Sequence, residues 1–422
     1  MRILLLGSGA REHAIALALA AEPEAHELLV APGNAGLADV ATLLPIDPQD
    51  PAAVADAALG NAVDLVVVGP EAPLTAGVAD AVRERGVPVF GPGREAARLE
   101  GSKAFAKRIM AAGGVPTGTA TEAATLGEAQ RLLSGAGPYV VKADGLAAGK
   151  GVLVTPDRDA ALAHAAQWLE HGPVLIEQFL AGREVSLFFV CDGDRVVPLA
   201  PAQDYKRLQD GDAGPNTGGM GAYSPLPWLA EAFGDERAFV DLVQQQVAEP
   251  VIAALAAEGC PFLGLLYCGL VVDGRDVRVI EFNARLGDPE TQVVLARLAS
   301  PLAPLLLAAA RGGLDAVPAP VFRNEAAVTV VLASEGYPDS PAVGRPVTGL
   351  AEAAAVPGAA VEHAATTRTP AGDVLASGGR VLSVVGRGAT LADARTTAYE
   401  ALRRIHLEGG QARSDIAAGI GG

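Results

Sequence analysis

Short apolar segments alternate with alanine-rich stretches along the first hundred residues, and this alternation limits the possible folds more than any other feature. Four segments have the length and apolar content of buried strands: residues 3–6, 28–31, 65–68 and 87–90. Strands that alternate with helices in this way predict an open parallel α/β sheet. Because such sheets bind ligands beyond the carboxyl ends of their strands, we expect a site at the loops GSGAREH, APGNAG, GPEAPL and GPGREA.

The first of these loops does not fit a dinucleotide-binding fold. In the register G-x-G-x-x-G, Glu12 stands where the third glycine belongs, and the second strand ends in APG rather than in the acidic residue that would hold a ribose. An NAD site is therefore not expected, and His13 is expected to be structural or to orient a substrate. Ordinary strand-to-helix turns remain the alternative for each loop taken alone.

Composition excludes several classes of function. The 422 residues are enough for two to four domains, since single cores stop growing near ~250 to 300 residues. The net charge is -17 and no block of basic residues is present, so we expect no nucleic-acid partner. The longest apolar run, residues 260–272, is shorter than the ~18 residues of a membrane span. Three cysteines without C-x-x-C or disulfide spacing favour reduced thiols in the cytoplasm.

Residues 140–151, VVKADGLAAGKG, combine two lysines with a glycine-rich segment that suits phosphate binding. A P-loop is not expected, because Gly145 and Gly149 are one residue too close and the Ser/Thr that would hold magnesium is absent. The flanking residues are instead typical of strands, which predicts a strand–loop–strand flap. Its backbone amides would cover phosphates while Lys142 and Lys150 supply charge. A solvated hairpin turn with two surface lysines remains the alternative.

The sequence GSKAFAKRIMAAGG predicts a helix over residues 103–112, with Ser102 as its N-cap and two glycines as its stop. Lys103, at the start of this helix, opposes the helix dipole at a cost of roughly 0.3 to 1 kcal/mol. A nearby anion such as a nucleotide phosphate would offset that cost. A tolerated surface lysine is the alternative.

The stretch VLIEQFLAGREVS predicts a strand over residues 174–177 that continues into a hinge. The backbone groups of the hinge suit the edge of an adenine. Glu177 and Glu184 are placed to accept hydrogen bonds from the adenine amine and the ribose hydroxyls respectively. Solvated glutamates near a strand end remain the alternative.

The stretch VRVIEFNARLGDPETQ places Glu281, Asn283 and Arg285 at alternate positions, and therefore on one face of an extended strand. Glu281 and Asn283 offer the oxygen ligands that Mg²⁺ accepts beside phosphates and water. Arg285 suits a bidentate contact with a phosphoryl group or a carboxylate. Asp288 and Glu290 lie in a turn over the same edge. An edge strand with a solvated polar face is the alternative.

Residues 203–225, QDYKRLQDGDAGPNTGGMGAYSP, are expected to form a long connection without regular structure, too polar to belong to a core. Asp204, Lys206 and Arg207 suit the orientation of a small zwitterionic substrate. Residues 216–221 offer unhindered backbone amides. A mobile surface loop is the alternative.

The rest of the pattern indicates a second α/β layer followed by a small α+β domain. Strands are expected at residues 186–190, 196–200, 263–272 and 278–282, with helices at 238–257 and 291–298. A proline-rich linker, residues 316–324, precedes a strand at 327–332, a strand at 380–385 and a helix capped by Thr390. No chemistry is evident in this last part, which suits a structural or substrate-closing role. The expected domains are residues 1–102, 103–320, with the flap at about 117–184, and 325–422.

The order of these features resembles the ATP-grasp superfamily. More narrowly, GSGAREHA, APGNAG, VGPEAPL, LEGSKAF, KADGLAAGKGV, QDYKR, GPNTGGMGAYSP and EFNARLGDPETQ resemble motifs of the phosphoribosylamine–glycine ligase family of purine biosynthesis. The resemblance covers nearly the full length, and the last two motifs are highly specific. It implies an enzyme that joins glycine to 5-phosphoribosylamine through glycyl phosphate, while ATP becomes ADP and phosphate, with Mg²⁺ or Mn²⁺. We expect a cytoplasmic monomer whose only partners are these small molecules.

The resemblance also implies roles for individual residues. ATP contacts are implied at Lys103, Lys142, Gly145, Gly149, Lys150, Gly151, Glu177, Phe179 and Glu184. Metal ligation is implied for Glu281 and Asn283, and catalytic roles for Arg285 and Lys142. Substrate contacts are expected at Gly9, Asn34, Glu71, Asp204, Lys206, Asn216, Gly218, Gly219, Arg285 and Asp288.

One position departs from the family pattern. Many ATP-grasp enzymes carry a further metal carboxylate on the preceding strand, where this chain has Tyr267 and Cys268. The metal shell is therefore expected to rest on two protein ligands with phosphate oxygens and water, and the number of metals stays open. Two other functions also stay open: a ligase or carboxylate kinase for another acid or amine, and a nucleotide-sensing module without catalysis.

Overall fold

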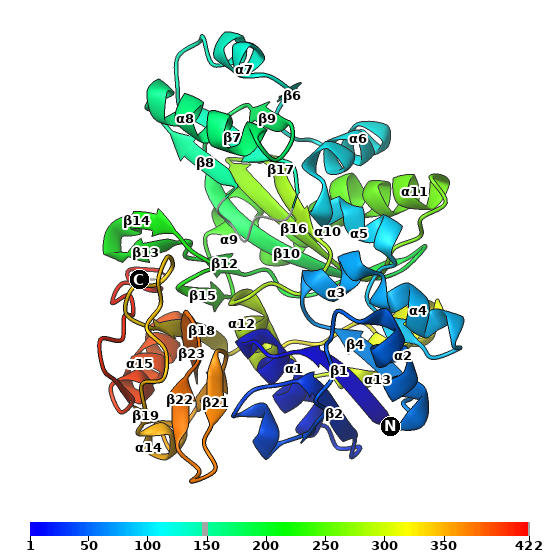
Figure 1. The fold of residues 1–422 in the computed structure, drawn as a ribbon, viewed down its shortest axis with the longest axis vertical. Coiled ribbons are helices and arrows are strands. Elements are labelled where there is room, and N and C mark those ends of the chain that lie inside the picture. Colours follow the sequence, from blue (N-terminus) through cyan, green and yellow to red (C-terminus); the bar gives the residue numbers. More distant parts are fainter. Residues whose placement is uncertain (146–150, 421–422) are drawn as a thin grey trace.

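The computed structural model describes residues 1–145 and 151–420, arranged as shown in Figure 1. The N-terminal part is a five-stranded parallel sheet with strand order β3-β2-β1-β4-β5. Its strands are β1 (Arg2–Gly7), β2 (Glu27–Pro32), β3 (Thr42–Leu43), β4 (Leu65–Val68) and β5 (Val89–Phe90). Its helices are α1 (Ala10–Ala20), η1 (Leu37–Asp39), α2 (Pro51–Gly60), α3 (Glu71–Ala76), α4 (Val78–Glu84) and α5 (Arg94–Gly101). The predicted open parallel sheet is confirmed, with β3 as an additional edge strand.

This sheet is apolar on both faces because both are covered. On β1, Leu4 and Leu6 belong to one core cluster, whereas Ile3 and Leu5 belong to another. Continuous apolar runs are the pattern of a parallel sheet buried on both faces. Because β1, β2 and β4 run parallel, the loops that follow them lie at the same edge of the sheet.

The predicted helix after this sheet is α6 (Lys103–Gly113). The Ser102 hydroxyl accepts a hydrogen bond from the Phe105 amide at 3.1 Å, as an N-cap does. The helix ends at Gly114, whose φ of 65° is left-handed. The predicted cap and glycine stop are confirmed.

A four-stranded antiparallel sheet forms the flap subdomain, at the top of Figure 1. Its elements are β6 (Ala120–Ala123), α7 (Leu126–Leu132), β7 (Tyr139–Ala143), β8 (Val152–Thr155), α8 (Arg158–Leu169) and β9 (Val174–Glu177). The predicted strands on either side of the glycine-rich segment are therefore present and paired with each other. Gly149 and Lys150 lie outside the described residues.

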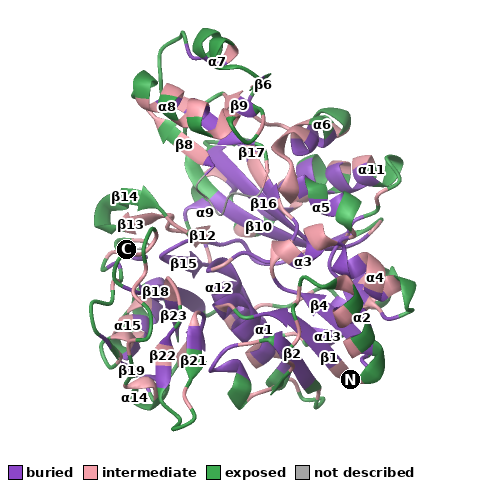
Figure 2. Cartoon of the chain, in the orientation of Figure 1, coloured by how far each residue is buried: buried purple, intermediate pink, exposed green. Residues whose placement is uncertain are grey.

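The central sheet is antiparallel, with order β11-β10-β16-β17. Its strands are β10 (Arg183–Asp192), β11 (Val196–Pro198), β16 (Leu263–Asp273) and β17 (Asp276–Asn283), and Figure 2 shows β10 and β16 almost wholly buried. The helices that follow or flank it are α9 (Leu229–Phe233), α10 (Glu236–Val243), α11 (Glu249–Ala257), α12 (Glu290–Arg297), α13 (Ala303–Arg311) and η4 (Leu314–Ala316).

The single helix predicted at residues 238–257 is wrong in one respect. A π-helical turn, η3 (Gln244–Ala248), separates α10 from α11. Pro250 follows directly, and it has no amide hydrogen to donate to the preceding turn. The wider turn accommodates that missing bond.

The prediction of an unstructured polar connection over residues 203–225 is also wrong. This segment contains β12 (Gln203–Asp204), β13 (Arg207–Gln209), η2 (Asp210–Asp212), β14 (Ala213–Asn216) and β15 (Gly221–Ser224). Met220 and Tyr223 are 0% exposed, so part of the segment belongs to the core. The glycines made the segment look like a loop, although glycine also occurs in strands where another part of the backbone packs closely. The short strand β15 was therefore not predicted.

β12 and β15 join a five-stranded sheet with order β12-β15-β18-β23-β20. The other C-terminal elements are β18 (Ala326–Ala333), β19 (Val347–Thr348), α14 (Leu350–Ala354), β20 (Ala359–His363), β21 (Thr366–Arg368), β22 (Val374–Ala376), β23 (Arg380–Gly388), α15 (Leu391–Leu402) and β24 (His406–Leu407). The sheet thus combines strands from both sides of the proline-rich linker. The division of the chain near residue 320 stays a prediction.

Within residues 1–145 and 151–420, no helix combines the length and apolar character needed to cross a membrane. The three cysteines carry free thiols. Cys191 and Cys268 are buried and Cys260 is partly exposed, which matches the expected core thiols at two of the three positions.

Candidate active site

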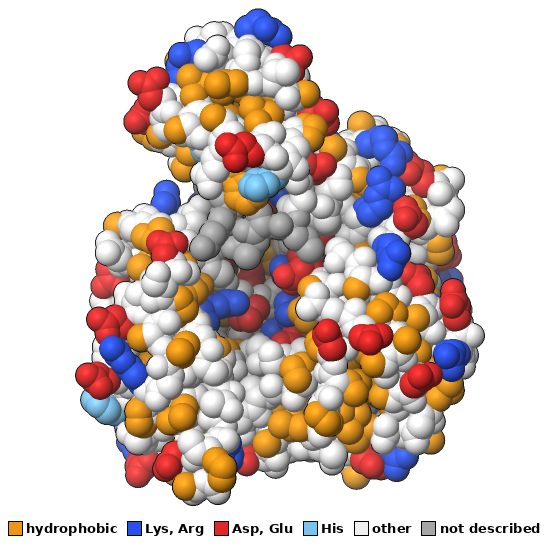
Figure 3. Space-filling model, in the orientation of Figure 1, with side chains coloured by type: hydrophobic (Ala, Val, Ile, Leu, Met, Phe, Trp, Pro, Cys, Tyr) orange, Lys and Arg blue, Asp and Glu red, His pale blue; other side chains and the backbone are white. Residues whose placement is uncertain are grey.

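Four of the predicted site residues act on Glu281, near the end of β17. They are Lys103 on α6, Lys142 on β7, Lys206 just before β13, and Arg285 just after β17. Figure 3 shows a hollow in this face of the molecule where acidic and basic side chains gather. Glu281 and Asn283 lie two residues apart on β17, as predicted. Arg285 lies beyond the end of the strand, in a bend, so the expectation that all three share one strand is wrong for Arg285.

Glu281 is surrounded by cationic side chains. Burial alone would raise the pKa of its carboxyl, but Lys206, Lys142, Lys103 and Arg285 together lower it. Opposite charges nearby favour the ionised form of a carboxyl group. Four cationic side chains therefore act on the carboxylate of Glu281, and cations beside an acidic oxygen ligand suit a polyanion together with a metal cation.

Lys142 is almost fully buried, at 3% exposure, and is fixed by two acceptors. Its Nζ lies 3.0 Å from Glu177 Oε2 and 3.1 Å from the carbonyl oxygen of Ile280. The β16–β17 pairing shifts register beside Ile280, between the pairs at Glu281 and Val279. A bulge of this kind leaves a residue outside the ladder, so the Ile280 carbonyl is available to the lysine.

Glu177 pairs with a second lysine that the sequence patterns did not single out. Lys107 Nζ lies 3.4 Å from Glu177 Oε2 and also donates to Thr117 Oγ1 at 3.0 Å. Lys103 and Lys107 are four residues apart on α6 and thus share a face, a spacing that would have identified Lys107. The predicted contact of Glu177 with adenine stays a prediction. Phe179, predicted beside it, is 41% exposed.

The protein itself supplies an anion at the start of α6. Asp144 Oδ1 accepts hydrogen bonds from the amides of Lys103, at 2.6 Å, and Ala104, at 3.3 Å. Asp144 Oδ2 accepts from the Ser102 hydroxyl at 3.2 Å. This carboxylate offsets the helix dipole, so Lys103 does not require a phosphate to explain its position. Lys103 Nζ donates to the Gly145 carbonyl at 3.2 Å, which joins α6 to the flap.

Lys206 and Asp204 lie in the segment that runs from β12 to the start of β13, and Lys206 is one of the cations that act on Glu281. Lys206 Nζ forms an ion pair with Glu184, the residue predicted to hold the ribose. Burial raises the pKa of Asp204 to about 7, opposed by Lys206 and reinforced by Glu290. Burial would lower the pKa of Lys206, but Asp204 and Glu184 in turn raise it, so Lys206 stays charged while the pKa of Asp204 lies near neutral pH.

Arg285 is held by two carboxylates from the N-terminal part. Its Nε lies 3.3 Å from Glu71 Oε2 and its Nη2 3.0 Å from Glu100 Oε1. Glu100 also accepts from the Ala284 amide at 2.7 Å. Burial would lower the pKa of Arg285, but Glu100 and Glu71 raise it. Glu100 was not predicted, because an isolated glutamate on α5 carries no motif.

Asp288 is held from the C-terminal sheet. Arg380 Nη2 lies 3.1 Å from Asp288 Oδ2, and Gln292 donates to Asp288 Oδ1 at 2.9 Å. Burial would raise the pKa of Asp288, but Arg380 and Arg11 outweigh it and the pKa is lowered. Arg380 was missed because the pairing spans 92 residues of sequence.

The predicted glycines and Asn216 occupy different surroundings. Gly219 has a φ of 105°, and a Cβ there would lie 2.4 Å from Pro289 Cδ, so this position requires glycine. The Gly218 amide donates to Tyr337 Oη at 2.9 Å. Gly9 lies next to Asp288, since a Cβ on it would be 3.6 Å from Asp288 Oδ2. Asn216 is exposed on β14, and Gly151 is buried beside β8.

Asn34 has a different engagement from the predicted substrate contact. Its Nδ2 donates to the carbonyls of Ser8, at 2.9 Å, and His363, at 2.7 Å. Its Oδ1 accepts from the amides of Gly36 and Leu37, each at 2.9 Å. The side chain therefore ties the loop after β2 to the loop after β1 and to β20.

His13 and His363 form a buried pair where α1 meets β20. The His363 amide donates to His13 Nδ1 at 2.7 Å, and the ring centroids lie 5.6 Å apart. Burial lowers the pKa of His13 to about 3, and the nearby His363 adds a smaller effect in the same direction. Burial lowers the pKa of His363 to about 4, with Asp39 opposing and Arg368 reinforcing. Because Nδ1 accepts a hydrogen bond, His13 has a structural role here, one of its two expected roles.

This pair makes the fold acid-sensitive. A histidine whose folded pKa is depressed contributes stability above its unfolded pKa, near 6.5, that is lost as pH falls. For each ring, the free energy of unfolding should fall by about 1.4 kcal/mol per pH unit below that value. We expect His13→Asn, which keeps an acceptor near Nδ1 but does not titrate, to flatten the fall in thermal midpoint between pH 6.5 and pH 4.5. Parallel curves for the two proteins would contradict this.

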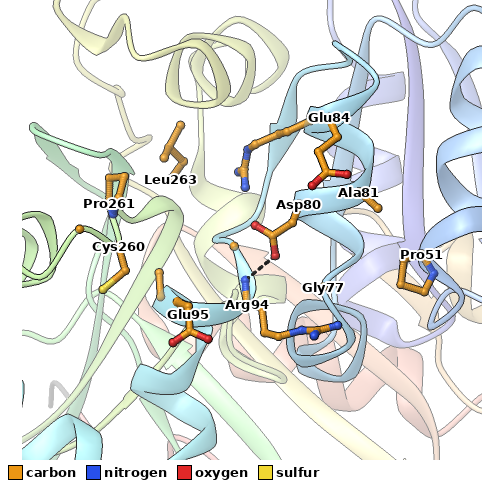
Figure 4. Close-up of a pocket in the computed structure, with 14 residues that line it drawn as sticks. Pro51, Gly77, Asp80, Ala81, Glu84, Arg94, Glu95, Cys260, Pro261 and Leu263 are labelled. Carbon is orange, nitrogen blue, oxygen red and sulfur yellow. Dashed lines mark hydrogen bonds between the residues drawn. The ribbon is translucent and has the colours of Figure 1, made fainter.

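A separate cavity of about 660 Å³ lies away from this cluster, and Figure 4 shows it. It is lined from α4, α5 and the start of β16 by residues that include Asp80, Arg94 and Cys260. The Arg94 amide donates to Asp80 Oδ2 at 2.7 Å across its wall. Among the predicted site residues that the structure describes, none lines this cavity, so its size does not make it the active site.

Three family models match successive parts of the chain. The phosphoribosylglycinamide synthetase N domain matches residues 1–100. The ATP-grasp (A) domain of the same synthetase matches residues 101–291, and its C domain matches residues 327–419. Together these matches cover most of the sequence.

Relatives and a solved structure resemble the chain over its whole length. The phosphoribosylamine–glycine ligase of Leifsonia xyli subsp. xyli is 64% identical over 99% of this chain and 100% of its own. The ligase of the same name from Streptomyces coelicolor is 56% identical over 100% of both chains. The crystal structure of phosphoribosylamine–glycine ligase from Thermotoga maritima has a TM-score of 0.83 and 35% identity, covering 99% of this chain and 100% of that chain.

Proposed function

Because this chain belongs to the phosphoribosylglycinamide synthetase family, we infer that it is an ATP-grasp ligase that joins glycine to 5-phosphoribosylamine. The products are glycinamide ribonucleotide, ADP and phosphate, and glycyl phosphate is the intermediate. The reaction belongs to purine biosynthesis. The observation that carries this function is the position of two lysines beside β17 and the flap. Lys142 Nζ is held between Glu177 and the carbonyl of Ile280, next to Glu281, and Lys103 Nζ donates to the Gly145 carbonyl.

We propose that the cations hold the phosphates of ATP. Lys142 and Lys103 reach the centre of the site from the flap and from α6, and their side chains are already fixed by protein acceptors. Phosphoryl transfer depends mainly on positioning and charge stabilisation, which fixed cations provide. Gly145 and Gly151 bound the part of the flap that would cover the phosphates and keep water from an acyl phosphate.

Glu281 and Asn283 fit a hard divalent cation, Mg²⁺ or Mn²⁺. The lowered pKa keeps Glu281 ionised, and the amide oxygen of Asn283 follows two residues later on the same strand. When bound, such a cation neutralises charge on the phosphates during transfer. Tyr267, on the neighbouring strand, donates to Glu290 Oε1 at 3.0 Å, so it serves a hydrogen-bond network instead of the metal.

The acid and the amine are proposed to bind between Arg285 and the N-terminal loops. Arg285 would steady the transferring phosphoryl group and the glycine carboxylate. Gly9, Glu71 and Asp288 would contact the substrates there, since Glu71 pairs with Arg285 and Gly9 lies next to Asp288. The segment from Asp204 to Lys206 is proposed to contact the substrates as well. We propose that the enzyme acts as a cytoplasmic monomer on small molecules alone.

The decisive test is ADP release from ATP with Mg²⁺ and 5-phosphoribosylamine, with glycine compared against alanine and serine. Release that requires glycine is the expected result. Release with alanine or serine in preference would identify a ligase for another acid. ATP binding without ADP release under any of these conditions would favour a nucleotide sensor, and release that ignores glycine would refute the substrate.

A further inference from the structure

Arg413, close to the C-terminal end, is among the largest side chains that the structure buries completely. Its Nη1 donates to Asp212 Oδ1 at 2.7 Å and to the Arg207 carbonyl at 3.2 Å, both on the β13–β14 hairpin. Its Nε and Nη2 each lie 2.7 Å from the carboxylate of Asp415. One guanidinium thus links the C-terminal tail to the hairpin that follows the substrate segment.

The residues beside Arg413 bind the same part of the chain. The Ser414 amide donates to Asp210 Oδ1 at 2.8 Å, and the Gly211 amide donates to Asp415 Oδ2 at 2.8 Å. Both contacts join residues 204 positions apart in sequence. The tail, defined here as residues 413–417, therefore holds the hairpin at several independent points.

Tyr205 connects this tail to the active site. The Arg413 guanidinium lies 4.8 Å from the centroid of the Tyr205 ring, and the Ala417 amide donates to Tyr205 Oη at 2.9 Å. The next residue, Lys206, contacts Glu184 and lowers the pKa of Glu281. Tyr205 and Lys206 are adjacent in the chain, so the tail contacts the same short segment that carries Lys206 to Glu184.

The chemistry of Arg413 favours a role in orienting its partners over a role in stabilising the fold. A buried ion pair is often no more stable than apolar side chains of similar volume. A guanidinium fork, in contrast, fixes the relative orientation of its carboxylate partners and stacks on an aromatic ring. We propose that Arg413 is a positioning residue that sets Lys206 in the active site through Tyr205 and the hairpin. The proposal rests on the proposed function, in which Lys206 belongs to the substrate site.

The test is a double-mutant cycle on the full chain with Arg413→Met and Lys206→Met, read as kcat/KM for glycine-dependent ADP release. Arg413→Met keeps much of the side-chain volume but loses the fork. We expect it to lower kcat/KM by about 10- to 100-fold, the scale of a small misplacement at a reacting centre. In the Lys206→Met background the same change should cost less than about threefold, because the residue it positions is gone.

Two further variants separate positioning from general destabilisation. Arg404→Met removes an arginine whose ion pair with Glu400 lies on the exposed end of α15, and it should leave kcat/KM unchanged. Arg413→Lys, which keeps a cation above Tyr205, should recover part of the lost activity. If Arg413→Met does not fold, Asp212→Ala replaces it in the cycle, since this partner is 70% exposed and its loss leaves Arg413 paired with Asp415.

Several outcomes overturn the proposal. Equal losses in both Lys206 backgrounds would show that Arg413 acts independently of Lys206. Full activity of a folded Arg413→Met protein, or of Lys206→Met alone, would remove the effect or its target. In each case glycine-dependent release by the unmodified protein would show that the proposed function still holds.

Discussion

Replacement of Arg285 by alanine is expected to lower kcat by roughly 10² to 10³, or about 2.7 to 4 kcal/mol, the scale of removing one preorganised transition-state contact. The guanidinium is fixed in advance, because Glu71 and Glu100 bind two of its nitrogens. Its charge is therefore in place before the phosphoryl group moves, at no cost in reorganisation. Steady-state ADP release at saturating ATP and glycine measures the effect.

The ion pairs suggest a competing explanation that needs its own control. In that explanation, Arg285 matters only because it compensates the buried Glu100, whose pKa burial raises. Glu100→Gln removes that carboxylate charge but leaves Arg285 paired with Glu71. If Arg285 acts on the substrate, Glu100→Gln keeps most of the kcat that Arg285→Ala loses. Near-normal kcat in folded Arg285→Ala would contradict the catalytic role.

Local patterns in the sequence were enough for the parts of the site built within one element. The flanking strands of the flap follow from apolar runs, and the Ser102 cap follows from its neighbours. The pairing of Glu281 with Asn283 follows from strand alternation. In each case the geometry depends on residues only a few positions apart.

Contacts between distant segments could not be predicted in this way. Arg380 reaches Asp288 and Arg413 reaches Asp212 only because the C-terminal sheet incorporates β12 and β15. That pairing was hidden, since the glycine-rich segment resembles a loop. Asn34 shows the same limit in two of its four hydrogen bonds, which join it to the carbonyls of Ser8 and His363, 26 and 329 positions away in sequence.

The C-terminal part is consequently more than a structural addition. Arg380 orients Asp288, His363 orients Asn34 and His13, and the tail holds the substrate segment. The contacts of Arg380 and of the tail lie beside Asp288 and Lys206, which are proposed to bind substrate. The substrate-closing role considered for the C-terminal domain stays a prediction.

Glu281→Gln is expected to raise the Mg²⁺ concentration for half-maximal activity by at least roughly 10- to 100-fold. That is the loss of metal affinity on mutating groups that only hydrogen-bond to metal ligands, and a direct ligand should cost at least as much. The substitution preserves shape but removes the negative charge of Glu281, the carboxyl whose pKa Lys206, Lys142, Lys103 and Arg285 lower. A metal ligand and a counter-ion to the lysines predict different responses. Asp276→Asn, at the exposed start of the same strand, is the matched control and should leave the titration unchanged.

Metal-free nucleotide binding distinguishes these two roles. If Glu281 is a metal ligand, the neutral variant removes one negative charge from the place where the phosphates are proposed to bind, so ADP without Mg²⁺ should bind at least as tightly as to the unmodified protein. If Glu281 served only to hold the lysines in place, its loss would weaken ADP binding with and without metal alike. An unchanged Mg²⁺ titration would contradict metal ligation. Tighter metal-free binding of ADP together with a raised Mg²⁺ requirement is the result expected of a carboxylate that binds the metal and, without metal, repels the phosphates.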